Sequence, residues 1–155
     1  MEHLIRPNSD ETVVLNVTPE SAGWQHLRFQ LVALAAGQTF QISTQNNEMA
    51  LVPLAGRGIC TVAGQRFELD RKGVFAELPH VLYVPPGHSL QVETTIDFEF
   101  ALGGAPAEGK YPLRMFNPTD IKREVRGGDA ARRQVHHLLA SPLPAERLIL
   151  YEVYV

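Results

Sequence analysis

The sequence predicts an all-β fold, a barrel or jelly-roll sandwich with few or no helices. Short runs of strand-forming residues recur along the chain with turn signals between them, at the spacing typical of sandwiches and barrels. The sharpest turn is Pro85-Pro86-Gly87, in which proline fixes φ and removes backbone donors. No long amphipathic helix interrupts this rhythm.

Each predicted strand has its own signal. Residues 27–34 are largely apolar, which suits a strand covered on both faces. Residues 39–45 alternate, with Phe40 and Ile42 on one face and polar side chains on the other. A turn at Gly64 joins two runs into a hairpin. The predicted strands of this part are residues 12–17, 27–34, 39–45, 49–54, 59–63, 65–69, 81–84, 90–94 and 97–102.

The pattern changes after Leu102. Residues 103–112 are rich in glycine and proline, so we expect a surface loop there rather than extended structure. Residues 121–126 predict a strand, and residues 132–139 predict either a strand or one helical turn. The last run, residues 147–155, is strongly β-forming. It has an apolar face that another surface would have to cover. We therefore expect a core within residues 12–102, followed by a crossover loop and closing strands within residues 103–155.

Composition limits the classes of function. A chain of 155 residues fits one domain, and a formal charge of -3 argues against nucleic acid as the main partner. No apolar run approaches the ~20 residues that a membrane helix needs, and the N-terminus, residues 1–7, lacks the layout of a secretion signal. We expect no membrane partner and a cytoplasmic protein. Cys60, the one cysteine, is interpreted as a small buried side chain.

The turns resemble those of the cupin family, whose metal is held by two histidines and a glutamate in a first motif and a histidine in a second. Counted from Gly37, the paired histidine positions fall on Ser43 and Gln45, and Glu48 lies close to the glutamate position. The second motif's proline and glycine are present in residues 85–87, but its histidine position falls on Leu90. Hydroxyl, amide and alkyl groups are poor or impossible ligands for transition metals. The prediction is no metal in this chain.

The six histidines do not suggest another metal site, because no two have the spacing of a ligand pair; they are His3, His26, His80, His88, His136 and His137. If residues 132–139 form a strand, the two adjacent histidines point to opposite faces. We interpret the histidines as exposed or bonded to backbone. Arg132 and Arg133 form the most polar cluster of the second half. These two side chains are either solvated or paired at an interface, or they bind a carboxylate.

At a finer level the chain resembles the N-terminal half of the 5-deoxy-glucuronate isomerases of inositol catabolism, a two-cupin family related to the 4-deoxy-5-ketouronate isomerases. The stretches that carry the resemblance are residues 22–27, 54–58, 83–87, 117–118, 127–135 and 145–154. The resemblance implies that residues 1–155 are one cupin-like domain of a longer protein. It also implies a divalent metal in the second cupin, and an isomerisation in which an open-chain uronate becomes its 2-keto isomer.

Two functions of different class follow. In the first, the chain is part of a sugar-acid isomerase whose chemistry is completed outside these residues, by a second cupin domain or a symmetry mate in a homo-oligomer. In the second, it is a stand-alone metal-free cupin that binds a small ligand, with the polar face of residues 39–45 lining its cavity. No catalytic residue is assigned. Arg132 and His136 are predicted to contact the substrate.

Overall fold

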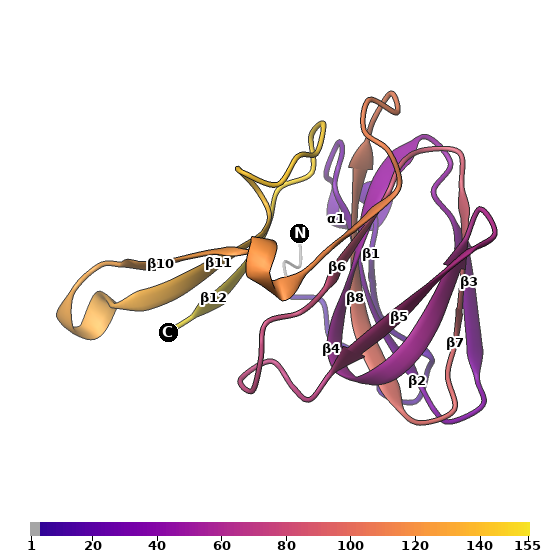
Figure 1. Ribbon diagram of the computed structural model, residues 1–155, viewed down its shortest axis with the longest axis horizontal. Helices are drawn as coiled ribbons and strands as arrows, with labels where there is room; N and C mark the ends of the chain where they lie inside the picture. The colour runs from indigo at the N-terminus through magenta and orange to yellow at the C-terminus, as the bar shows by residue number, and fades with distance from the viewer. Residues whose placement is uncertain (1–3) are drawn as a thin grey trace.

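The computed structural model describes residues 4–155, and nearly all of its regular structure is β-strand (Figure 1). Within these residues the one α-helix is a single turn, and two short 3₁₀ turns interrupt the second half. The elements are β1 Val13–Val17, α1 Pro19–Ala22, β2 Arg28–Leu34, β3 Thr39–Ser43, β4 Asn47–Val62, β5 Gln65–Arg71, β6 Val81–Val84, β7 Ser89–Glu93, β8 Phe98–Pro106, β9 Arg114–Phe116, η1 Pro118–Asp120, β10 Lys122–Arg126, η2 Asp129–Ala131, β11 Arg133–Leu139 and β12 Leu150–Tyr154.

Strands β1 to β9 form one nine-stranded antiparallel sheet that folds over itself as a barrel. Its main order is β1-β2-β8-β4-β6-β9, and β4 also pairs with β5 and β7, while β7 pairs with β3. The long strand β4 therefore belongs to both walls of the barrel. The predicted all-β barrel is confirmed. None of the helices within residues 4–155 is long and apolar enough to cross a bilayer.

Strand β4 differs from the expectation of two strands separated at residues 55–58. It runs unbroken over sixteen residues, with a register shift between Pro53 and Ala55. Gly56 makes this possible, because its φ of +89° is a conformation that other residues rarely adopt. A Cβ on Gly56 would also lie 1.9 Å from the carbonyl oxygen of Asp97 on the neighbouring chain segment. The glycines that predicted the end of a strand instead form a bend within one continuous strand.

Strand β8 extends further than predicted, because Gly103 and Gly104 belong to it rather than to a loop. Both are paired on two sides, with β2 through Arg28 and Phe29 and with β4. A Cβ on Gly104 would lie 2.8 Å from Cγ of Arg28, so the absence of side chains lets the strands approach. Pairing on both edges offsets the low strand propensity of glycine.

Apolar side chains fill the barrel. Phe40 and Ile42 point inward, as their alternation predicted, and Phe40 packs edge-on against Phe100 with ring centroids 5.7 Å apart. Cys60 is fully buried in the same cluster, and burial raises the pKa of its thiol to about 12. The polar face of β3 is exposed outside the barrel. This face therefore does not line the interior of the barrel, and of its members Thr39 borders a groove on the outside.

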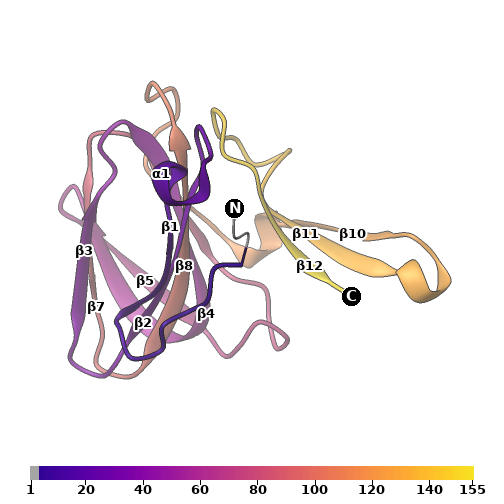
Figure 2. The same ribbon diagram turned by 180° about the vertical axis from the view of Figure 1, so that it is seen from behind.

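A second sheet projects from the barrel (Figures 1 and 2). It consists of β10, β11 and β12 in that order, all antiparallel, and we call it the arm. The strand alternative for residues 132–139 is therefore the one observed. A second apolar cluster joins the base of the arm to the outer face of β4 and β6, and it includes Tyr83, Phe116, Leu138 and Leu148.

Candidate functional site

The positions that would hold a cupin metal do not converge on a site. Ser43 and Gln45 are exposed, whereas Leu90 is fully buried in the barrel core. A hydroxyl, an amide and a leucine do not fit the donor set of a divalent transition metal. Within residues 4–155 no group of three or more His, Cys, Asp and Glu side chains lies close enough to hold one. These three side chains therefore support no reaction step through a metal.

Glu48, the residue near the cupin glutamate position, lies on the outer face of β4 and is fully buried beneath the base of the arm. Its carboxylate accepts hydrogen bonds from the backbone N–H groups of Glu146, Arg147 and Leu148 at 2.9, 2.7 and 2.6 Å. The hydroxyl of Tyr83 donates a fourth, at 2.8 Å. Burial, together with the Glu48 carboxylate, raises the pKa of Tyr83, so its hydroxyl stays a donor. Glu48 is an anchor for the chain entering β12.

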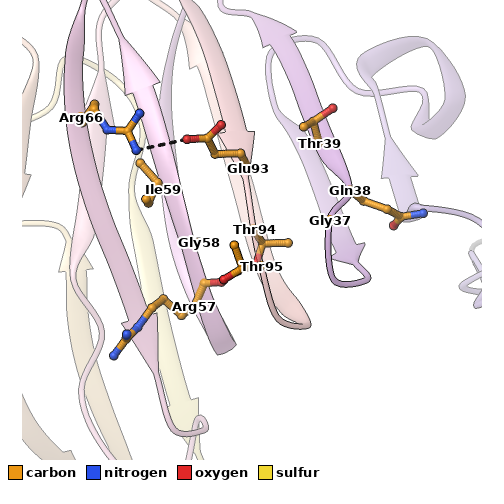
Figure 3. A pocket seen from close by; sticks show the side chains of 10 residues that line it. All are labelled: Gly37, Gln38, Thr39, Arg57, Gly58, Ile59, Arg66, Glu93, Thr94 and Thr95. Carbon is orange, nitrogen blue, oxygen red and sulfur yellow. Dashed lines mark hydrogen bonds and ion pairs between the residues drawn. The ribbon is translucent and has the colours of Figure 1, made fainter.

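A groove of about 410 Å3 opens on the outside of the barrel, next to β3, β4 and β7 (Figure 3). The guanidinium of Arg66 and the carboxylate of Glu93 form an ion pair at 3.2 Å in its lining, with the Arg66 side chain exposed and the Glu93 side chain half-exposed. Arg57 and Gln38 also line the groove, and threonine hydroxyls are added by Thr39, Thr94 and Thr95. The charges of Arg66 and Glu93 neutralise each other in solvent, which leaves the exposed Arg57 as the remaining charge of the lining.

The strongest polar cluster joins the barrel to the arm. Arg71, at the end of β5, is fully buried, and its guanidinium donates to both carboxylate oxygens of Glu152 on β12, at 2.5 and 2.9 Å. Three backbone carbonyls also accept from this guanidinium, those of Pro53, Val74 and Glu77. Burial opposes ionisation of Glu152, but the hydrogen bonds from Arg71 and Tyr154 outweigh it and lower the pKa of the carboxyl. The pair is charged and bidentate.

A cleft of about 470 Å3 lies beside this pair, between the arm and the β5–β6 loop. His136 lines the cleft and is buried, and the Gln134 amide donates to its Nε2 at 2.8 Å. The other ring nitrogen of His136, Nδ1, lies 3.6 Å from a carboxylate oxygen of Glu152 and has no hydrogen-bond partner among the described residues. Arg123, the cross-strand partner of His136, adds a cation.

The two predicted substrate contacts are not brought together. His136 lines the cleft, but Arg132 is exposed and does not line it. The adjacent His137 points to the opposite face of the arm, as the strand alternative predicted, where its Nε2 lies 3.0 Å from Glu124. Both histidines are buried, so the expectation of exposed or backbone-bonded rings is wrong for this pair. His88 does contact backbone carbonyls. His3 lies outside the described residues.

Sequence reasoning missed Arg71 and Glu152. Arg71 lies in Asp70-Arg71-Lys72-Gly73, which has the composition of an exposed turn, and its partner is 81 residues away. No local pattern identifies such a pair. The one available signal is Glu152 itself, a single acid within an otherwise apolar strand.

Comparison with known proteins connects the whole chain to one family. Residues 3–155 match the model of the KduI/IolB family. A 5-deoxy-glucuronate isomerase of Geobacillus kaustophilus is 36% identical over 99% of this chain and 58% of its own length. One of Geobacillus thermodenitrificans is 36% identical over 96% of this chain and 55% of its own length. The crystal structure of an IolB-like protein from Salmonella typhimurium superposes with a TM-score of 0.92 at 28% identity, covering 99% of this chain and 59% of that one.

Proposed function

Since this chain belongs to the KduI/IolB family, we propose that it forms one half of a sugar-acid isomerase whose substrate is 5-deoxy-glucuronate. The observation that carries the proposal is the match over residues 3–155, together with the identity to relatives that bear this name. The chain spans little more than half the length of these relatives. The proposal therefore assigns this half a binding and framework role.

The reaction that the proposal implies takes a proton from the hydroxyl-bearing carbon next to the aldehyde and returns it to the aldehyde carbon, through an enediolate, while the hydroxyl proton passes to the former aldehyde oxygen. It needs a positioned base and a group that stabilises the enediolate oxygens. Ser43, Gln45 and Leu90 do not offer these groups at the place where a cupin centre would lie. We assign the reacting centre, and the divalent metal that the resemblance implies, to the other half of the enzyme. Both assignments are predictions.

The cleft between the arm and the barrel is where this half would contact the sugar acid. Arg123 supplies a guanidinium that suits a carboxylate, and His136 and Tyr154 supply groups that suit hydroxyls. The volume of about 470 Å3 is within the usual range of small-molecule sites. The contact predicted for His136 is kept in this proposal. Arg132 remains a prediction at the exposed turn that precedes β11.

Turnover of 5-deoxy-glucuronate tests the isomerase assignment. The substrate is supplied to this chain alone, and to this chain joined to the part of the Geobacillus kaustophilus isomerase that it does not match. We expect the 2-keto product, followed by NMR, only from the joined protein. If the joined protein is folded and the intact Geobacillus enzyme is active under the same conditions, absence of product from the joined protein rejects the proposal.

The role of the cleft has a test of its own in the joined protein. Arg123→Gln should raise KM about tenfold or more with little change in kcat, because a carboxylate far from the reacting carbons is bound equally in ground and transition states. Arg126→Gln is the matched control, since Arg126 lies on the other face of β10 and is bonded to Glu124. Equal KM values for the two variants would remove the cleft from the proposal.

The second candidate, a metal-free small-ligand module, is favoured by one observation. The cleft has a cation beside a buried histidine, and within residues 4–155 no group of His, Cys, Asp and Glu side chains that could hold a metal ion lies beside them. Binding of 5-deoxy-glucuronate by the isolated chain, measured by calorimetry, without turnover by the joined protein would support this function. Turnover by the isolated chain would exclude it.

A further inference from the structure

The cleft beside the Arg71–Glu152 pair contains a buried polar atom that the packing of the arm does not use. His136 is 6% exposed, and its ring packs against that of Tyr154 at a centroid distance of 4.9 Å. Its Nδ1 has no hydrogen-bond partner among the described residues. Folded proteins pair nearly all of their buried polar atoms, and the exceptions include catalytic groups. This nitrogen therefore points to a role beyond packing.

A carboxylate faces that nitrogen. An oxygen of Glu152 lies 3.6 Å from Nδ1 of His136. Glu152 is fixed in place, because Arg71 binds both of its oxygens at 2.5 and 2.9 Å and the Tyr154 hydroxyl donates to it at 2.8 Å. A fixed carboxylate behind one nitrogen orients an imidazole and stabilises the imidazolium that forms when it takes a proton. In ligand-free sites such contacts are often long, and they tighten when a ligand binds.

The other ring nitrogen of His136 is within reach of a ligand. Nε2 is contacted by the side-chain amide of Gln134 at 2.8 Å, and both residues line the cleft. Gln134 is exposed, so its side chain can turn into solvent and leave its place to a ligand hydroxyl. The imidazole thus has a carboxylate on one side and the cleft on the other. It can exchange a proton with a hydroxyl bound there.

The substrate of the proposed function needs such a proton exchange before it can isomerise. Because 5-deoxy-glucuronate has no hydroxyl on C5, its aldehyde closes onto the hydroxyl of C4 and forms a five-membered cyclic hemiacetal. Isomerisation requires the open-chain aldehyde, so the ring must open first. Opening removes the proton of the anomeric hydroxyl and returns one to the ring oxygen. One positioned acid–base group can carry out both transfers.

We propose that the cleft opens this hemiacetal, with His136 as the catalytic residue. Nε2 takes the proton of the anomeric hydroxyl, the bond between C1 and the ring oxygen breaks as the carbonyl forms, and the imidazolium returns the proton to the ring oxygen. No other reactant is needed. Arg123, the cross-strand partner of His136, receives the carboxylate, whose carbon is two bonds from the carbon that carries the ring oxygen. This inference rests on the proposed function, because that function supplies the ligand.

Exchange between the two anomers of 5-deoxy-glucuronate, followed by NMR magnetisation transfer, tests the proposal on this chain alone. A positioned acid–base group contributes about 100-fold to 10,000-fold, so the exchange rate should exceed that with free imidazole at equal concentration by at least about tenfold. His136→Asn should abolish this excess. His137→Asn is the matched control, since it removes the adjacent imidazole on the opposite face, and it should leave the rate unchanged.

Two results of this measurement would overturn the proposal. One is an exchange rate with the native chain no higher than that with free imidazole. The other is an equal rate for His136→Asn and His137→Asn, because a specific role of the cleft requires the two variants to differ.

Nitrogen NMR of the native chain tests the assignment without a catalytic variant. Nε2 can act as the base only if the neutral ring of His136 carries its proton on Nδ1, and the shifts of the two ring nitrogens distinguish the two forms. A neutral ring protonated on Nε2 would overturn the proposal. Glu152 is the positioning residue, so Glu152→Gln should weaken the preference for Nδ1, which a merely structural role would not do. Unchanged shifts in Glu152→Gln would overturn the pairing of carboxylate and imidazole.

Ring opening and isomerisation can fail separately. Anomer exchange that depends on His136, without 2-keto product from the joined protein, would reject the isomerase assignment and retain ring opening. Formation of the 2-keto product by the joined protein, with anomer exchange as fast in His136→Asn as in the native chain, would retain the isomerase assignment and reject ring opening.

Discussion

At the scale of single residues, two carboxylates, the buried Glu48 and the half-buried Glu146, hold the chain as it returns to the barrel after the arm. Glu48 holds three successive backbone N–H groups of residues 146–148. Glu146 itself accepts from the N–H groups of Glu108, Gly109 and Lys110. The backbone bond from Lys110, followed by those from its neighbours, keeps the pKa of Glu146 below its usual value against partial burial. Two carboxylates thus fix a segment that lies outside the strands.

Glu48→Gln tests this anchor. The amide keeps one acceptor but turns an NH2 group toward backbone donors, so at least one buried N–H loses its partner. We expect the free energy of unfolding, measured in urea, to fall by about 1 to 3 kcal/mol. Glu68→Gln, an exposed position on β5, is the matched control and should change it by less than about 0.5 kcal/mol. Equal effects of the two variants would contradict an anchoring role.

At the scale of elements, the arm is held by its side chains rather than by a core of its own. Central strand β11 places His136 and His137 on opposite faces, and each histidine lies beside a glutamate from a neighbouring strand. On the face of His137, Glu124 also accepts from Arg126 at 2.6 Å and lies 3.4 Å from the ammonium of Lys122. Three-stranded sheets with little apolar cover depend on such cross-strand pairs.

The Glu124 cluster should make the arm sensitive to acid. The hydrogen bond from His137, then those from Arg126 and the charge of Lys122, lower the pKa of Glu124 from 4.5 to about 2 despite partial desolvation. A carboxyl whose folded pKa is depressed stabilises the fold above its unfolded pKa and loses this contribution as the pH falls through the folded value. The contribution should therefore be complete above pH 4.5 and lost by about pH 2.

Urea unfolding of the native chain and of Glu124→Gln, measured across this pH range, checks the expectation. The difference in stability between the two proteins should stay constant above pH 4.5 and disappear near pH 2. His137→Asn removes the principal partner and should shrink the pH-dependent part of that difference. A difference that persists undiminished at pH 2 would show that Glu124 acts through packing rather than through its charge.

At the scale of the whole molecule, one buried ion pair and one apolar cluster connect arm and barrel. Arg71 belongs to β5 of the barrel, and Glu152 belongs to β12 of the arm. The guanidinium is fully buried, so removing either partner leaves the other without compensation. Because the candidate cleft lies beside this pair, between β12 and the loop that follows β5, the pair holds the two walls of the cleft together.

Arg71→Met should lower the free energy of unfolding by about 3 to 5 kcal/mol, because Glu152 is left without its cation beneath the arm. Hydrogen exchange should quicken more in β12 than in β3. Arg66→Met removes the exposed pair with Glu93 and, as the control, should cost no more than about 1 kcal/mol. If the two arginine variants were equally stable, the pair would not hold the arm in place.

The sequence by itself determined the rhythm of strands and turns and the inward face of β3, because side-chain alternation is local and has a period of two. It predicted opposite orientations for His136 and His137 only on the condition that residues 132–139 form a strand. It also identified the family. Only the tertiary structure decided that Gly56 bends one strand, that Gly103 and Gly104 lie in β8, and that Glu48 faces the arm. These outcomes, like the pairing of Arg71 with Glu152, depend on neighbours distant in sequence, whose burial and hydrogen bonds outweigh local propensity.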